Sequence, residues 1–357
     1  MALSAIDTIS LAFDHTKEHL FRPFRLGQWL RLALLGFMTG ELSTGGSCNP
    51  GSLNDLKKIQ DQTNGTSGSE QFLPTPHIDP HLIGPIFLGL GVALLLISVL
   101  ILAWMYVGSV CRFILIESVI SKRVSLREGW HKWHAAGRRF FLWRLTYQIV
   151  AGIFFAILVG VPFGLAAALG WFENPEEHIL PIILTAVPFA FLILLATIVA
   201  VLVWLFAKDF MAPIMAVEDL DFADAWNILL AMMKKEKGAF AGYVGMKVVL
   251  AIAAEILFGI VIFIAVLLVA LPGAIAGAAA VFAGNAAGLT WTAGTITLAI
   301  VAASMLFVVV MVLSAMLSVP VTLYFPAYSI YFLASRYPKL DAWLHPPPVA
   351  PGTTTPG

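Results

Sequence analysis

Long apolar segments dominate this chain, and shorter segments of mixed, helix-periodic pattern separate them. A helix needs about 20 residues to cross a hydrocarbon core of about 30 Å. Segments of at least that length occupy residues 82–120, 142–170, 179–217, 240–271 and 296–319. A shorter segment, 26–40, crosses only if Arg31 extends to the polar side, and a half-crossing is the alternative. We therefore predict an all-α, multi-pass membrane helix bundle of about six spans, with bends at Pro188 and Pro213 in the long fourth segment.

The segment 124–144 has a strongly amphipathic helical pattern. One narrow face holds the apolar residues Leu126, Trp130, Trp133, Gly137 and Phe140. The opposite face holds the polar residues Arg127, Glu128, His131, Lys132, Arg138 and Arg139. This pattern predicts an interfacial helix whose tryptophans lie at headgroup depth and whose cations face lipid phosphates.

Similar amphipathic segments precede two other apolar hairpins. VSLREGW ends at Trp130 and LDFADAW ends at Trp226, and each follows a long apolar segment and precedes a basic cluster. Residues 4–21 form a weaker version. We expect an integral membrane domain, 1–336, of three repeated units at about 1–121, 122–219 and 220–336. An extramembrane loop at 41–82 and a flexible proline-rich tail at 337–357 complete the chain.

Composition supports the membrane class and limits the alternatives. The chain has 357 residues, 59% hydrophobic and 12% charged, with a mean hydropathy of +0.89, which is far more apolar surface than a soluble fold could bury. With six crossings, all of the 21 lysines and arginines except Lys57 and Lys58 lie on or near one side. This bias predicts that both termini are cytoplasmic. The two cysteines predict neither a disulfide framework nor a zinc site.

Two stretches carry a family resemblance. FMAPIMAVEDLDFADAW, residues 210–226, contains Phe210, Pro213, Glu218 and the Ala225-Trp226 pair, and FRPFRLGQWLRLALLGF occupies 21–37. Together they resemble the membrane domain attached to some glycerophosphodiester phosphodiesterases and related uncharacterised prokaryotic membrane proteins. The resemblance implies a six-helix domain in a prokaryotic cytoplasmic membrane, and no reaction. Phosphodiesterase activity there belongs to a separate soluble α/β barrel, which has no counterpart in this sequence.

Glu255 is the sharpest candidate for a functional residue, because an ionisable group within an apolar span is costly unless it is paired, protonated or facing water. A structural hydrogen bond to a neighbouring helix is the simpler interpretation, and a proton, ion or substrate site is the alternative. Lys247 precedes it by eight residues, roughly 12 Å along a helix, which is too far for a direct pair. Tyr147 and Gln148 in the third span are plausible polar neighbours.

Basic residues in the amphipathic segments are candidates for contacts with lipid headgroups, each worth about 1 kcal/mol near an anionic surface. Topology and anchoring alone are the simpler interpretation. These residues are Arg127, Lys132, Arg138, Arg139, Lys234, Lys235 and Lys237, with Trp130, Trp133 and Trp226 as interfacial anchors. Nucleic-acid binding is disfavoured because membrane-seeking tryptophans alternate with these cations.

Metal binding has only weak support. Glu128, His131 and His134 recur every three residues, and His77, Asp79 and His81 lie in the polar loop, but neither set has a strong ligand pattern. We expect no metal site and no cofactor.

No catalytic motif is recognisable in the sequence. The leading hypothesis is therefore a non-enzymatic membrane scaffold, lipid-interacting module or partner subunit, with membrane lipids and a possible membrane-protein partner as its contacts. A small-solute or lipid transporter that uses Glu255 is the alternative, and an intramembrane enzyme has the least support.

Overall fold

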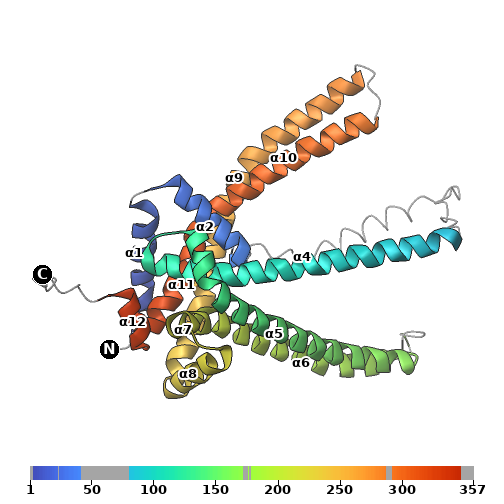
Figure 1. Ribbon diagram of the computed structural model, residues 1–357. Helices are drawn as coiled ribbons and strands as arrows, with labels where there is room; N and C mark the ends of the chain where they lie inside the picture. The colour runs from blue at the N-terminus through green and yellow to red at the C-terminus, as the bar shows by residue number, and fades with distance from the viewer. Residues whose placement is uncertain are drawn as a thin grey trace, which may run out of the picture.

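A computed structural model describes residues 3–22, 24–41, 80–171, 176, 178–286 and 292–346 of the protein (Figure 1). Within these residues the fold is entirely helical, which confirms the predicted class. The helices are α1 (Asp7–Phe21), α2 (Leu26–Thr39), α4 (Pro80–Ser121), α5 (Leu126–Ala168), α6 (Ile179–Phe206), the π-helical turn η3 (Ala207–Met211), α7 (Ala212–Glu218), α8 (Phe222–Lys235), α9 (Lys237–Ala286), α10 (Ala293–Leu317), α11 (Val319–Ala334) and α12 (Pro338–Leu344).

Three arms project from one compact base (Figure 1). The arms are α4, the α5/α6 hairpin and the α9/α10 hairpin, and they diverge as they leave the base. The base consists of α1, α7, α8, α11, α12 and the adjoining ends of the long helices. Large side chains such as Phe113, Phe210 and Tyr243 are fully buried in it. Large apolar side chains of the arms, such as Phe154 and Phe307, are exposed instead.

The exposed apolar arms are the membrane-spanning part of the protein. Five helices of the described chain are long and apolar enough to cross a membrane, over 87–121, 126–168, 179–218, 237–284 and 294–334. An arm that is apolar on all sides is stable in hydrocarbon, where it needs no further protein cover. The protein is therefore a multi-pass membrane protein.

The first apolar segment forms a short helix rather than one of these five spans. Helix α2 has 14 residues, so it extends about 21 Å, which is less than a hydrocarbon core of about 30 Å. Its Leu32 and Leu35 side chains are fully buried in the protein. Glu41 follows α2 and pairs with Arg112 in the later part of α4, whereas α4 begins at the far end of its arm (Figure 1). The connection between them, 42–79, lies outside the described residues.

Prolines interrupt the long helices less than expected. Helix α6 continues through Pro188 and gives way to η3 only at Ala207, shortly before Pro213. Helix α9 continues through Pro272 to Ala286, beyond the end of the apolar segment predicted at 240–271. Proline is tolerated inside membrane helices because nearby groups satisfy the backbone carbonyls that it frees.

The amphipathic segment at 124–144 is the first part of α5, and its apolar face packs against α4. Gly129 and Gly137 permit this contact, because a Cβ atom at Gly137 would lie 2.6 Å from a methyl carbon of Val110. Trp133 is only 7% exposed. Its indole stacks on Phe113 and donates a hydrogen bond to Glu117 at 2.5 Å. Trp133 therefore packs on protein, a contact that the sequence pattern alone does not show, and its position at headgroup depth remains a prediction.

Trp130 and Trp226 are half-buried at the edge of the base. The aromatic ring of Trp130 contacts Tyr106, and that of Trp226 stacks on Phe222. Their anchoring role remains a prediction, as does the threefold repeat.

Two buried histidines join α1 to the rest of the base. His15 Nε2 lies 2.8 Å from the carbonyl oxygen of Val119, to which it donates, and its Nδ1 accepts from the Tyr331 hydroxyl at 3.0 Å. His19 is 4% exposed, and no described residue forms a hydrogen bond with either of its ring nitrogens. Burial lowers the pKa of His15, and burial together with nearby His15 and Lys122 lowers the pKa of His19 to about 4. Both rings are therefore neutral in the folded protein at pH 7.

We predict that acidification destabilises the base through His19. Its pKa is lower in the folded chain than in the unfolded chain, so its contribution is complete above pH 6.5 and is lost as the pH falls towards 4. The loss amounts to about 3 kcal/mol for a shift of this size. His19→Leu should flatten the dependence of the thermal unfolding midpoint, measured in detergent, between pH 7 and pH 4. The exposed control His131→Gln should retain it, and an equal slope in wild type and His19→Leu would contradict the assignment.

Candidate functional site

Charged side chains from all three arms meet where the arms join the base. We call this group the ionic cluster. It comprises Glu41 after α2, Arg112 of α4, Lys208 and Asp209 of η3, and Tyr243 and Lys247 of α9.

Arg112 is the cation that connects most of these groups. Its guanidinium pairs with the Glu41 carboxylate. Its Nη2 donates to the backbone oxygen of Lys208 at 3.0 Å and lies 3.7 Å from Oδ1 of Asp209. The Lys208 ammonium reaches the other Glu41 oxygen at 2.6 Å. Glu41 therefore bridges two cations from two different arms.

Asp209 is the most deeply buried member, with its side chain 1% exposed. It accepts a hydrogen bond from the Tyr243 hydroxyl at 3.0 Å and pairs with the Lys247 ammonium. Burying a carboxylate is tolerated only when it is paired and hydrogen-bonded. The partners of Asp209 belong to α4 and α9, so its charge links the α6 arm to both other arms.

The backbone at Asp209 is a π-helical turn, from Ala207 to Met211. Such wide turns hold one additional residue within an otherwise α-helical segment and are frequent at functional sites. Here the turn allows the consecutive residues Lys208 and Asp209 to take part in the same cluster. It also separates the apolar arm α6 from the buried helix α7.

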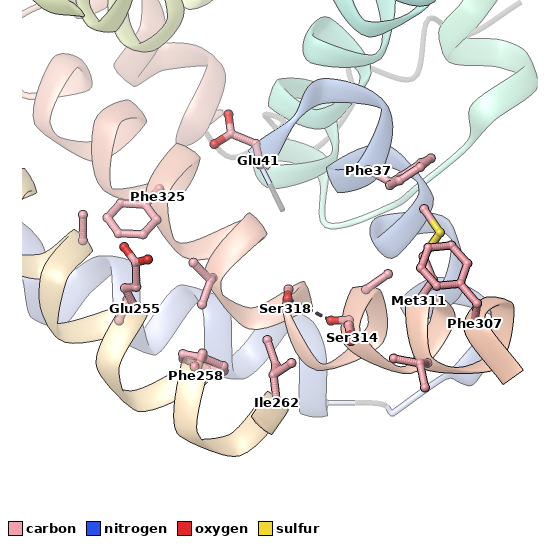
Figure 2. Close-up of a pocket in the computed structure, with 16 residues that line it drawn as sticks. Phe37, Glu41, Glu255, Phe258, Ile262, Phe307, Met311, Ser314, Ser318 and Phe325 are labelled. Atoms are coloured by element: carbon pink, nitrogen blue, oxygen red, sulfur yellow. Dashed lines mark hydrogen bonds between the residues drawn. The ribbon is translucent and has the colours of Figure 1, made fainter. Parts of the chain in front are cut away.

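A pocket of about 430 Å³ lies beside the cluster, among α2, α9, α10 and α11 (Figure 2). Most of its lining is apolar, including Phe37, Phe258 and Phe307. Its polar lining residues are Glu41, Glu255, Ser314 and Ser318. Glu41 thus belongs to both the ionic cluster and the pocket wall.

Glu255 faces this pocket, next to the ring of Phe325 (Figure 2). It is the only Asp, Glu, Lys or Arg between Lys247 and Arg336. Among the described residues, no hydrogen-bond donor or cation pairs with its carboxylate. Lys247, expected near it, pairs with Asp209 instead.

The structure separates the other predicted neighbours of Glu255 from it. The Tyr147 hydroxyl of α5 donates to the Ala200 carbonyl of α6 at 2.7 Å. Gln148, also on α5, is exposed. Neither residue lines the pocket, because α5 belongs to a different arm. The grouping of Tyr147 and Gln148 with Glu255 is therefore wrong.

The predicted headgroup cations have different surroundings. Lys132 pairs with Glu117, and Arg139 pairs with Asp219 and Asp221, so both have protein partners. The others are exposed on the base, and these are Arg127, Arg138, Lys234, Lys235 and Lys237. Their contact with lipid remains a prediction.

Among the described residues, no group of three or more His, Cys, Asp or Glu is arranged to hold a metal ion. His77 and Asp79 lie outside these residues.

Sequence reasoning missed the ionic cluster, although it left a signal. Lys208 and Asp209 are adjacent charges inside an apolar segment, and Arg112 interrupts another. Charges in such positions usually face other protein groups. Their pairing could not be deduced, because Glu41 and Arg112 are separated by 71 positions.

We predict that the cluster stabilises the junction of the arms. Asp209→Asn leaves buried cations without their counter-charge and should lower the free energy of unfolding by about 3–5 kcal/mol. Adding Lys247→Met should restore part of this loss, so the double variant loses less than the sum of the single variants. Asp219→Asn is the control, since an exposed pair contributes less than about 1 kcal/mol. Thermal unfolding in detergent, followed by tryptophan fluorescence, measures wild type, the two single variants, the double variant and the control, and strict additivity would contradict the coupling.

Comparison with known proteins gives a family but no activity. No curated protein and no solved structure matches the chain. The comparison shows no link to the phosphodiesterase-associated membrane domain that parts of the sequence resemble. Residues 3–343 match a family of unknown function, which covers nearly the whole chain. The chain belongs to that family, DUF7544.

Proposed function

We propose that this protein is a lipid-binding membrane protein that holds one amphiphile in the pocket among α2, α9, α10 and α11. The observation that carries the proposal is the lining of that pocket. Its walls are almost wholly apolar, and its few polar groups include Glu41, a member of the ionic cluster. A pocket of about 430 Å³ is within the size range of small-molecule sites.

The position of the pocket also favours a membrane ligand. It lies where the α9/α10 arm joins the base, next to surfaces whose apolar side chains are exposed. A ligand with an acyl chain could enter from the hydrocarbon without crossing water. No catalytic group is needed for this function, which agrees with the absence of a recognisable catalytic motif in the sequence.

We further propose that the base faces the cytoplasm of a prokaryotic cell and that the arms cross the cytoplasmic membrane. The exposed cations of the base support this orientation, because cytoplasmic segments of membrane proteins are enriched in lysine and arginine. The first and last described residues both lie at the base (Figure 1). Anionic lipids of the inner leaflet would contact Arg127, Arg138, Lys234, Lys235 and Lys237.

Filling the pocket should weaken lipid retention. Ala254 lines the pocket, and its neighbour Ala253 is exposed and does not. We expect Ala254→Trp to reduce the phospholipid retained by the purified protein, in native mass spectrometry, by about tenfold in affinity, which corresponds to about 1.4 kcal/mol. Ala253→Trp adds the same bulk on the lipid-facing side and should leave retention unchanged. Equal retention in both variants would contradict the proposed site.

A transporter is the second candidate, because a carboxylate in a membrane pocket is a common element of solute pathways. Access of water to position 255 separates the two functions. We expect Glu255→Cys, in a Cys48→Ser and Cys111→Ala background, to react with a membrane-soluble apolar maleimide and with no membrane-impermeant reagent from either side. Labelling by the impermeant reagent in folded protein would show an aqueous path and would favour transport over lipid binding.

A further inference from the structure

The polar groups of the pocket are hydrogen-bond acceptors and hydroxyls. Among the residues that the structure describes they are two glutamates and two serines, and no described lysine or arginine lines the pocket. The Ser318 hydroxyl already donates to the backbone oxygen of Ser314 (Figure 2). One carboxylate oxygen of Glu41 already pairs with Arg112, and the other pairs with Lys208. The remaining carboxylate, Glu255, is therefore the group that a ligand would have to satisfy.

Two aromatic rings lie on the pocket wall near the Glu255 side chain. The ring of Phe325, on α11, lies directly next to the carboxylate, and Phe258 lies one helical turn further along α9 (Figure 2). Phe325 is 4% exposed, which fixes the position of its ring. A cation is attracted to the face of an aromatic ring, and rings that surround a site are how proteins recognise quaternary ammonium groups. A carboxylate among rings has the complementary charge for such a group.

The counter-charge for Glu255 does not come from the nearest lysine. The Lys247 ammonium lies 5.7 Å from the centre of the Phe325 ring. However, it pairs with Asp209, and its side chain is only 13% exposed. It is held in the ionic cluster, so the charge of Glu255 remains available to a ligand.

Glu255 and some of the apolar lining residues lie at opposite ends of the pocket. Glu255 and Phe325 lie at the end near the base, and Ile262, Phe307 and Met311 lie at the other end (Figure 2). From Ser318 back to Phe307 the lining extends eleven residues, or about 16 Å, outward along α10. An amphiphile with its head at Glu255 would therefore extend its chain outward, parallel to the arm. Lipids of the leaflet that adjoins the base have this orientation.

We propose that the pocket binds an amphiphile whose head carries an ammonium group, with Glu255 as the counter-charge and Phe258 and Phe325 as its aromatic contacts. This inference rests on the proposed lipid-binding function and specifies its ligand class. The alkyl chain of the amphiphile occupies the apolar part of the pocket towards Phe307.

Two photoreactive probes test the head group. Both carry a diazirine on a dodecyl chain, one with a trimethylammonium head and the other with a neutral hydroxyl head. They are added to the full-length protein in phosphatidylglycerol vesicles, and crosslinked peptides are identified by mass spectrometry. The ammonium probe should label pocket residues at about one-tenth of the concentration that the hydroxyl probe requires.

Glu255→Gln keeps the size of the side chain and removes its charge. It should lower labelling by the ammonium probe about tenfold, to the level of the hydroxyl probe, and leave the hydroxyl probe unchanged. Phe258→Leu should lower ammonium labelling by a smaller factor of about three. Asp224→Asn, which removes an exposed carboxylate of the base, is the matched control and should change neither probe.

The outcomes separate this inference from the broader proposal. If Glu255→Gln leaves the preference for ammonium unchanged, the head-group assignment is overturned, whereas labelling of the pocket by both probes would still support lipid binding. If neither probe labels the pocket in wild type, or if Ala254→Trp does not reduce labelling, the lipid-binding function itself is overturned.

Competition identifies the source of the ammonium group. Replacing half of the phosphatidylglycerol with phosphatidylethanolamine should reduce labelling if the natural ligand is a bilayer lipid with an amino head. If only free dodecylamine competes, the ligand is a hydrophobic amine that enters from outside the bilayer. Both results support ammonium recognition, and failure of both competitors would overturn it.

Discussion

The buried charge of Asp209 is the constraint on which the assembly of this protein depends. The three arms diverge and are apolar on their outer surfaces, so hydrophobic burial does not draw them together within a membrane. Their common contact is at the base, where Asp209 in one arm meets Arg112 and Lys247 from the other two. A carboxylate that is 1% exposed there requires both cations in place. The base is therefore a junction whose geometry is set by charge as well as by packing.

Much of the secondary structure could be predicted from the sequence, because helices in a membrane follow from apolar length. The segment 296–319 corresponds closely to α10, the segment 179–217 covers the consecutive elements α6, η3 and α7, and the segment 142–170 forms the later part of α5. The residues at which the helices end were harder to predict. Helix α9 continues through Pro272 to Ala286. Membrane helices tolerate proline, so the position of a proline in the sequence does not show where such a helix ends.

The site was less predictable for a different reason. Glu255 could be identified because a single charge in an apolar span is unusual, and it does line a pocket. Its neighbours depend on which arm each helix joins, and Tyr147 belongs to another arm. Trp133 shows the same limit, since an apolar helix face has the same pattern whether it contacts lipid or protein. The residues that contact Trp133, Glu117 and Phe113, belong to α4, and their position next to it is not apparent from the sequence of α5.

The π-helical turn has a consequence for how the protein could tolerate insertions and deletions. Residues 207–211 hold one more residue than a regular turn would. Because the wide turn absorbs the additional residue, deleting one residue there would restore an ordinary α-helix with little rotation of α7 relative to the α6 arm. The deletion would instead remove the local geometry by which the consecutive residues Lys208 and Asp209 both reach the ionic cluster. The length of the chain at this point is therefore constrained by the cluster rather than by the packing of the helices on either side.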